Sequence, residues 1–466
     1  MLISSIFGSM RIQEEGIGMD IEQLQQLQPA LYAYVAQFDD CVKTRPSRQH
    51  LWTYVAGQLG PLPRKSVEPM ALEAGVPPRT LQEFLALHGW DEQAVARRHR
   101  ALVQQHHGHP NAIAIIDETS CPKKGDKTPG VQRQHCGATG KTDNCVVTVH
   151  LGYVAGDFHT LLDGELFLPE ESWAADRERC RRAGIPDAVV YRPKWQIALE
   201  LLTRALAEGV RLRWLTADEA YGRVSTFRKA VEQAGLRYMV EIPRDLTGWI
   251  RRPQVEPAGT VTRAGRTLRK ARVARGQPAA RPVWQLGDQA GVPWQLYRVK
   301  DTEKGPCVWR VRQLRFFPSA EGLAGGKLRL IEAQEVLTGE VKYFLSNAPM
   351  KVPLKMLLCV GFARWHIERL FEDSKQEVGF DHFEVRTYRP LMRHLVLTML
   401  SLYFLVEQTD RLRGEKSVVD RWPGEGSGRG TTGPRHVPAG VHTPAPAGGQ
   451  EDRVLATECG QSGRFP

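Results

Sequence analysis

The chain has 466 residues, and its 63 Lys and Arg against 52 Asp and Glu give a formal net charge of +11 at pH 7. That length is too great for one compact hydrophobic core, so two or three domains are expected. The basic excess favours a polyanionic partner, because Lys and Arg neutralise phosphates and release counterions, although a basic enzyme with another substrate would carry the same charge.

The cysteines and the apolar segments argue against several classes of protein. The eight cysteines are scattered and form no CxxC pair, which disfavours a zinc ribbon and a disulfide framework. Reduced thiols in a cytosolic protein are the simplest interpretation. No run of 18 or more apolar residues occurs, so no membrane-spanning segment is expected.

Residues 20–108 are predicted to be helical, because apolar residues recur at helical spacing, and they are the candidate DNA-binding region of the chain. Within it, residues 66–74 and 79–88 predict two helices, and Gly75 and Pro77 mark a turn between them. This pair is either a helix-turn-helix whose second helix enters a DNA groove or an ordinary pair of packed helices.

An α/β pattern begins at residue 109. Segments follow in the order strand, strand, strand, helix, strand, helix, strand, at 111–120, 144–156, 158–169, 194–208, 211–222, 225–234 and 237–243. This order predicts a mixed sheet, with a core built from 109–245 and 336–413. The later part is expected to be a returning strand and two strongly helical stretches, 353–380 and 388–411.

Residues 246–335 interrupt that pattern and are predicted to be a basic, β-rich insertion. Between 251 and 300 there are eleven Arg or Lys and two acids. The segment favours contacts with a DNA backbone from Arg266, Arg269 and Arg272, with rings able to stack on an unpaired base: Trp249, Trp284 and Trp294. A β-domain with a Trp core and a solvated basic face fits the same composition.

Both ends of the chain lack the pattern of a folded segment. Residues 1–19 have no basic stretch before their apolar start, so they predict a disordered leader rather than a signal peptide. Residues 414–466 are rich in Gly, Pro, Ser and Thr and predict a disordered tail, or non-native sequence from a frame change.

Two acids stand at the ends of apolar strands. Asp117 ends AIAIID, and Asp218 follows WLTA. Strand ends are rigid platforms, so the two carboxylates can converge on one point. Converging carboxylates suit Mg2+ or Mn2+, and two such ions can promote phosphoryl transfer. An acid at a strand end is also common in sheets without catalysis.

The helical segment RWHIERLFEDSK offers a third carboxylate. Arg364, Glu368 and Lys375 lie at i, i+4 and i+11, so they share one helix face. That face presents a carboxylate between two cations suited to phosphates. Glu372 shares the face and by spacing alone could replace Glu368, and a solvated stripe of salt bridges would have the same pattern.

These residues resemble a known family. Asp117, Asp218 and Glu368 are similar to the acid triad of the DDE transposases, which have a ribonuclease-H-like catalytic fold. The helical segment is similar to the Tyr-x2-Arg-x3-Glu-x6-Lys signature of a large branch of bacterial insertion-sequence transposases. In that register Arg364, Glu368 and Lys375 take the Arg, Glu and Lys positions, which favours Glu368 over Glu372. Gly361 stands at the Tyr position.

The resemblance covers roughly residues 25–410. Further similar blocks are DETSCPKKG, GVQRQHCGATGK, DGELFLPE, ADEAYGR and EDSKQEVGFDHFEVRTY. It implies a multidomain α/β protein: a ribonuclease-H-like mixed sheet, a β-rich insertion and an N-terminal helical domain.

The implied function is that of a DNA transposase. Such an enzyme binds the terminal inverted repeats of its insertion sequence, cleaves the ends with metal, two Mg2+ or Mn2+ ions being expected, and joins the 3′-OH ends to target DNA. The implied partners are double-stranded transposon ends, target DNA and a second copy in a synaptic homodimer, in the bacterial cytosol and on the nucleoid. A same-fold endonuclease without transposition and a catalytically inactive DNA-binding derivative remain alternatives.

The loop after Asp117 adds two basic candidates. Lys123 and Lys124 could hold phosphate near the metals, and an ordinary basic loop is the other interpretation.

Overall fold

The structure is a computed structural model that describes residues 21–259, 261, 270–302 and 305–413. The predicted leader over 1–19 and the predicted tail over 414–466 lie outside these residues. So do Arg266 and Arg269, two of the predicted DNA-backbone contacts.

The N-terminal part is helical, as the apolar spacing predicts. Its helices are α2 (Ile21–Ala36), α3 (Arg45–Leu59), α4 (Val67–Glu73), α5 (Pro78–Ala86) and α6 (Glu92–His107). The turn between α4 and α5 contains Gly75 with φ of +68°, a left-handed conformation that glycine adopts without strain. The predicted helix, turn, helix arrangement is therefore present, and its use in a DNA groove stays a prediction.

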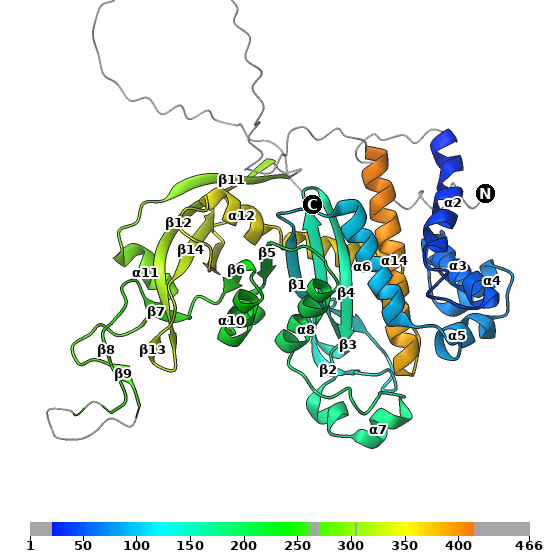
Figure 1. Ribbon diagram of the computed structural model, residues 1–466, viewed down its shortest axis with the longest axis horizontal. Coiled ribbons are helices and arrows are strands. Elements are labelled where there is room, and N and C mark those ends of the chain that lie inside the picture. The colour runs from blue at the N-terminus through cyan, green and yellow to red at the C-terminus, as the bar shows by residue number, and fades with distance from the viewer. Residues whose placement is uncertain (1–20, 260, 262–269, 303–304, 414–466) are drawn as a thin grey trace, which may run out of the picture. The chain divides into compact units, whose positions relative to one another are not determined.

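These helices pack against the last described helix, α14 (Tyr388–Arg413), which lies beside them in Figure 1. Buried hydrogen bonds join the two parts, among them Tyr34 Oη to the Leu400 carbonyl (3.0 Å), Tyr54 Oη with His394 Nδ1 (2.8 Å), and Gln58 Nε2 to Thr398 Oγ1 (2.9 Å). Helix α14 is long and apolar enough to cross a membrane, but 89% of its apolar window is buried inside the protein, as in a core helix.

The centre of the protein is a mixed sheet. Its first strands are β1 (Ile113–Pro122), β2 (Gln132–Cys136), β3 (Lys141–Ala155), β4 (Phe158–Leu166), β5 (Trp214–Ala217) and β6 (Arg237–Ile242). Strand β3 is antiparallel to both of its neighbours, β1 and β4. Strand β5 is parallel to both of its neighbours, β1 and β6. This arrangement confirms the expected mixed α/β architecture and is consistent with a ribonuclease-H-like core.

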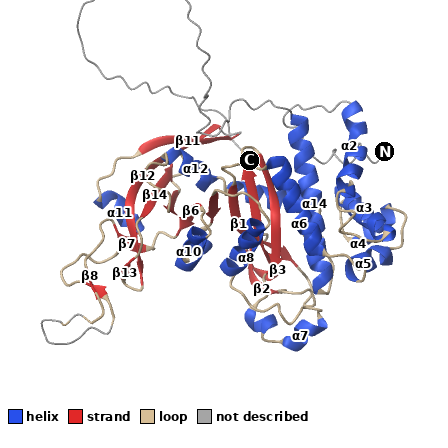
Figure 2. Cartoon of the chain, viewed as in Figure 1, coloured by secondary structure: helices blue, strands red, loops and turns tan. Residues whose placement is uncertain are grey.

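The basic segment after β6 extends the same sheet. It contains β7 (Thr247–Trp249), β8 (Val255–Glu256), β9 (Arg272–Val273), β10 (Arg281–Pro282), α11 (Val283–Gln289), β11 (Gln295–Thr302), β12 (Gly305–Ala320), β13 (Leu323–Ala324) and β14 (Leu328–Glu335). Strand β15 (Val341–Ser346) pairs with β14 on one edge and β6 on the other. Strand pairing thus crosses the predicted boundary of the insertion, and the red strands of Figure 2 follow one another from the insertion into the core.

Helices cover both faces of the sheet. They are α7 (Arg177–Arg182), α8 (Lys194–Ala207), α9 (Glu219–Gly222), α10 (Ser225–Gln233), α12 (Leu354–Phe362) and α13 (Trp365–Gln376), with a π-helical turn over Glu170–Ala174. The stretch over 353–380 that is predicted to be strongly helical contains two helices, α12 and α13, joined by a tight turn at 363–364. Four short elements were not predicted, because each is too short to show a periodic pattern of apolar residues: β2, the π-helical turn, α7 and α9.

A buried ion network joins three of these elements. Arg100 of α6, whose side chain is 1% exposed, donates to Asp163 of β4 at 2.8 Å and to both oxygens of Glu208, beyond α8, at 2.6 and 2.9 Å. Arg204 of α8 approaches the same Asp163 oxygen at 3.1 Å. The network therefore ties the N-terminal helices to the sheet and to α8.

Removing Arg100 should destabilise the fold strongly. Arg100→Met should cost about 3–5 kcal/mol of unfolding free energy, because two carboxylates lose a buried partner. The control is Arg97→Met, since Arg97 lies 3.5 Å from the same Glu208 with a side chain 63% exposed and should contribute less than about 1 kcal/mol. Urea unfolding measures both values. Similar losses in the two variants would contradict the importance assigned to the buried network.

Candidate active site

The parallel pairing of β1 and β5 sets the geometry of the site. Their last paired positions are Ile116 and Ala217. The next residue of each chain segment is an acid, Asp117 on one and Asp218 on the other. Both predicted carboxylates therefore lie where β5 ends, although β1 continues to Pro122 in its pairing with β3, so Asp117 lies within its strand.

Backbone amides hold each carboxylate in place. Asp218 Oδ1 accepts from the Ala220 and Tyr221 amides at 3.0 and 3.3 Å, so it caps the short helix α9. Asp117 Oδ1 accepts from the Glu118 amide at 2.8 Å. Each acid therefore keeps its second oxygen for another partner.

Arg364 connects β1 to α13. Its guanidinium lies 3.1 Å from Asp117 Oδ2 and 2.7 Å from Glu368 Oε1. It also approaches Glu241 of β6 at 3.9 Å. The predicted third acid is thus linked to the first through a shared cation, and the three charged residues belong to one cluster.

The carboxylates at this edge are destabilised in their charged form. Burial, and next the charge of Asp218, raise the pKa of Asp117 to about 7, although Arg364 opposes the change. Burial and the charge of Glu118 raise the pKa of Asp218. Burial acts to lower the pKa of Arg364, but the surrounding carboxylates outweigh it and raise the value above the ordinary one.

Such a pair of acids fits a divalent cation, because hard oxygen ligands and relief of charge repulsion both favour Mg2+ or Mn2+. In the part of the chain that the structure describes, no three His, Cys, Asp or Glu side chains lie close enough to hold a metal ion. Glu368 is 57% exposed and engages Arg364, so the three acids do not form one ligand set in this conformation.

Helix α13 distinguishes the two candidate glutamates. Glu368 lies in its first turn and reaches the cluster, whereas Glu372 pairs with Arg369 at 3.5 Å on the outer surface. Lys375 in the last turn donates to the Ser120 carbonyl of β1 at 3.2 Å. Geometry therefore favours the register in which Arg364, Glu368 and Lys375 act together.

Gly361, at the Tyr position of the resemblance, lies on α12 against β6. A Cβ there would approach Met239 Cε to 2.8 Å, so a larger residue would have to displace that side chain. The departure from the signature has a packing reason.

The other predicted phosphate ligands lie in different settings. Lys123 Nζ donates to the Asp381 and Phe383 carbonyls at 3.0 and 2.7 Å, so its ammonium is held by the backbone. Lys124 is exposed. Arg272 is half-exposed and pairs with Glu256 at 2.9 Å. Their contacts with DNA stay predictions.

Sequence reasoning missed three residues near the two acids. They are Glu118, Lys194 and Glu241. Glu118 Oε1 lies 2.6 Å from Lys194 Nζ, and Tyr221 Oη donates to Glu118 Oε2 at 2.6 Å. An available signal was an acid inside or just after an apolar strand, which Glu118 and Glu241 share with Asp117.

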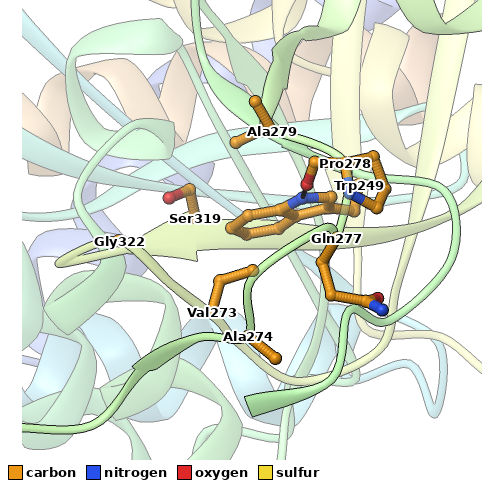
Figure 3. Close-up of a pocket in the computed structure, with 9 residues that line it drawn as sticks. Trp249, Val273, Ala274, Gln277, Pro278, Ala279, Ser319 and Gly322 are labelled. Carbon is orange, nitrogen blue, oxygen red and sulfur yellow. Dashed lines mark hydrogen bonds between the residues drawn. The ribbon is translucent and has the colours of Figure 1, made fainter. Parts of the chain in front are cut away.

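The insertion contains a separate cavity of about 360 Å3, which has Trp249, Gln277 and Ser319 in its lining and no carboxylate (Figure 3). Trp249 is buried and its Nε1 donates to the Pro278 carbonyl at 2.8 Å. Trp294 packs against two guanidinium groups, those of Arg310 and Arg312. Trp249 thus belongs to a local core, whereas Trp284 remains 42% exposed.

Two comparisons with known proteins bear on this site. A family model described as DDE superfamily endonuclease matches residues 37–306, more than half of the chain. The chain is also 33% identical over 190 residues to a "Probable transposase for insertion sequence element IS701" of Microchaete diplosiphon. That alignment covers 40% of this chain and 46% of the relative, so the match spans less than half of each protein. The family match includes both strand-end acids and ends before Glu368.

The charge repulsion at the strand ends predicts a stability effect. An aspartate whose pKa is raised on folding contributes stability that is complete below its unfolded pKa near 4 and is lost as pH rises through about 7. In the metal-free protein, Asp117→Asn should therefore be more stable than the wild type at pH 8, by about 2–4 kcal/mol, and little different near pH 3.5, below the unfolded pKa.

Urea unfolding in EDTA at the two pH values measures this difference. Asp187→Asn is the control, because Asp187 is 77% exposed and should show no such pH dependence. An Asp117→Asn variant less stable than the wild type at pH 8 would show that attraction to Arg364 outweighs burial and repulsion.

Proposed function

Since the chain belongs to the family of DDE superfamily endonucleases, we propose that it is a DNA transposase. It binds the terminal inverted repeats of an insertion sequence, cleaves the ends by metal-dependent hydrolysis and joins the 3′-OH ends to target DNA. The observation that carries this proposal is the meeting of Asp117 and Asp218 at one edge of the sheet, beside a cation that also holds Glu368. The match to the probable transposase supports transposition over other endonuclease activities.

In this proposal Asp117, Asp218 and Glu368 hold the metal. Mg2+ or Mn2+, as two ions, would supply activation of the attacking oxygen and stabilisation of the leaving oxygen. Glu368 lies on a helix surface and is exposed, so it can turn toward the strand ends without repacking the core. The amides that cap Asp218 fix its orientation and leave its other oxygen free to point outward.

Arg364 and Lys375 are proposed to contact the phosphates around the cut. Both lie on the face of α13 that packs beside β1, one at each end of the helix. Arg364 is charged under all relevant conditions and can exchange a carboxylate for a phosphate oxygen, because its planar fork suits both. The backbone contact of Lys375 positions its ammonium next to the strand that carries Asp117.

DNA recognition is proposed to divide between two surfaces. Arg79 and Gln82 are exposed at the start of α5, where a helix entering the major groove would read base edges. Arg251 and Arg252 are exposed on the insertion, where a broad basic surface would neutralise phosphates without reading sequence.

A second copy of the chain is proposed as the partner, because two transposon ends must be held together before joining. The proposed place of action is the bacterial cytosol, on the nucleoid when DNA is bound.

Cleavage of end DNA should require a divalent cation and Glu368. With Mg2+ or Mn2+, Glu368→Gln should lower the cleavage rate at least about a hundredfold while binding in Ca2+ stays within about twofold, because the acid acts on the metal and not on DNA affinity. Glu372→Gln, one turn along, is the matched control and should keep most of the activity. Cleavage in EDTA would contradict the requirement for metal. Loss of cleavage in Glu372→Gln with cleavage kept in Glu368→Gln would contradict the assignment of the third acid.

The same preparation tests joining. A pre-cut end with a free 3′-OH should become covalently attached to a supercoiled plasmid when Mg2+ is present. Cleavage without attachment would identify a nuclease of this fold rather than a transposase.

Substitutions on the two DNA surfaces should differ in kind. The double variant Arg79→Ala, Gln82→Ala should lose discrimination between end and random DNA, because base contacts give specificity. The double variant Arg251→Gln, Arg252→Gln should weaken binding to end DNA and to random DNA by the same factor. It should also reduce the slope of log affinity against log salt concentration, by up to about 0.9 per lost phosphate contact. Affinity in Ca2+ across a salt series measures both. Loss of end preference with an unchanged salt slope in the insertion variant would contradict the division.

A further inference from the structure

The loop that follows helix α13 is held by two lysines from distant parts of the chain. It runs over residues 377–387, between α13 and α14. Lys65 comes from the connection between α3 and α4, and Lys123 follows the end of β1. We call these two lysines, together with the loop carbonyls that they bind, the lysine clamp. The clamp lies outside the carboxylate cluster, but it reaches the end of the helix that carries Glu368.

Lys65 caps the C-terminal end of α13. Its Nζ donates to the carbonyl of Glu377, the residue at which the helix ends, and to the Gln58 carbonyl at 2.7 Å. Carbonyls at a helix C-terminus lack partners within the helix and carry partial negative charge, so an ammonium is favourable there. Lys65 is 6% exposed, and burial lowers its pKa to about 8, although the charge of Glu377 opposes the change.

The close approach of Lys65 depends on a glycine of the loop. Gly379 has φ of +68°, and a Cβ at this position would lie 2.6 Å from Lys65 Cβ. The Lys65 amide also donates to His382 Nδ1 at 2.9 Å. Backbone and side chain of Lys65 are therefore both fitted to the loop.

Lys123 holds the same loop from the side of the sheet. Its Nζ donates to the carbonyls of Asp381 and Phe383 and lies 3.5 Å from the centroid of the Phe383 ring. Its own backbone is fixed to β3, because the Lys123 amide donates to the Asn144 carbonyl at 2.8 Å and the Lys123 carbonyl accepts from Asn144 Nδ2 at 2.7 Å. An ammonium held in this way cannot contact a phosphate without leaving both carbonyls.

Contacts between β1 and α13 run in both directions. Lys375, in the last turn of α13, donates to the Ser120 carbonyl of β1. Lys123, just beyond that strand, in turn binds the loop that leaves α13. The last turn of the helix is therefore fixed to β1 from two sides, while Lys65 fixes it to the N-terminal helices. The Lys375 ammonium thus has a defined place beside the strand that carries Asp117.

From these contacts we propose that Lys65 and Lys123 are positioning residues, which hold the last turn of α13 and so place Lys375 for contact with the phosphates around the cut. The inference rests on the proposed function, because that function gives Lys375 its phosphate. It gives the N-terminal helices a part in the rate of cutting, since Lys65 belongs to them rather than to the sheet. Lys123 acts through the loop and is not itself a phosphate ligand.

The test measures cleavage by complexes that are already formed. Full-length protein in excess binds DNA carrying the terminal repeat of the element in Ca2+, and exchange into Mg2+ starts a single round of cleavage. Lys123→Met, which removes the ammonium, should slow this round roughly 10- to 100-fold, as expected when a reacting group is misplaced by about 1 Å. Affinity in Ca2+ should stay within about twofold with an unchanged salt slope, because no phosphate contact is lost.

This rate separates positioning from stability, because it does not depend on how much of the protein is folded. Lys123→Arg should restore most of it, since a guanidinium can bind the same carbonyls and stack on the Phe383 ring. Lys375 holds no metal in the proposed function, so Lys375→Met should keep measurable cleavage. In that background Lys123→Met should slow cleavage by less than about twofold more, because the group that it positions is gone. Lys229→Met, at an exposed lysine of α10, is the matched control and should cut at the wild-type rate.

Lys65→Met tests the link to the N-terminal helices. Its bound complexes should also cut roughly 10- to 100-fold more slowly. The preference for end DNA over random DNA should be unchanged, because the capping contact is remote from the exposed start of α5. Bound Lys65→Met complexes that cut at the wild-type rate would show that this lysine stabilises the fold alone.

Further results would overturn the inference. Weaker binding with a flatter salt slope in Lys123→Met would identify a phosphate ligand. Equal losses from Lys123→Met with and without Lys375 would show that the clamp does not act through that group. If the wild type and Lys123→Met cut bound DNA equally fast, the clamp falls while the proposed function stands. If wild-type protein neither binds nor cuts the ends, the proposed function and the inference fall together.

Discussion

The parallel pairing of β1 with β5 is the constraint from which the site follows. The pairing aligns Ile116 with Ala217, so the next residues, Asp117 and Asp218, lie side by side where β5 ends. Two acids in partial burial repel each other, and the fold must supply positive charge there. Arg364, at the start of α13, supplies that charge, because its guanidinium lies 3.1 Å from Asp117 Oδ2.

Arg364 gives the edge of the sheet a fixed counter-charge. A guanidinium cannot lose its proton under ordinary conditions, so the acids have a partner before any ion or DNA arrives. The same group touches Asp117, Glu368 and Glu241, which come from three different elements. Its position therefore keeps strand β1, strand β6 and helix α13 in a common arrangement, and the reactive edge is organised by one side chain rather than by many weak contacts.

Sequence patterns identified the parts of the site that depend on local rules. An acid that ends an apolar run marked Asp117 and Asp218, and helical spacing marked Arg364 and Glu368, because both signals repeat within a few residues. Glu118 shares the signal of an acid in an apolar strand, but its role could not be predicted, since it depends on Lys194 and Tyr221, which only the tertiary fold brings to it. The continuation of the sheet into the insertion was also hidden, because strand patterns do not say which neighbour a strand pairs with.

The shared core of the first helices and α14 has a consequence for how the protein is made. Tyr54 and Gln58 are near the beginning of the chain, while their buried partners His394 and Thr398 are near the end of the described part. During synthesis the early helices cannot complete their core until α14 has left the ribosome, although domains often fold in the order they emerge. In an unfinished chain the sides of α3 and α5 that pack against α14 would be exposed, so the N-terminal helices would reach their native packing only when the last described helix is complete.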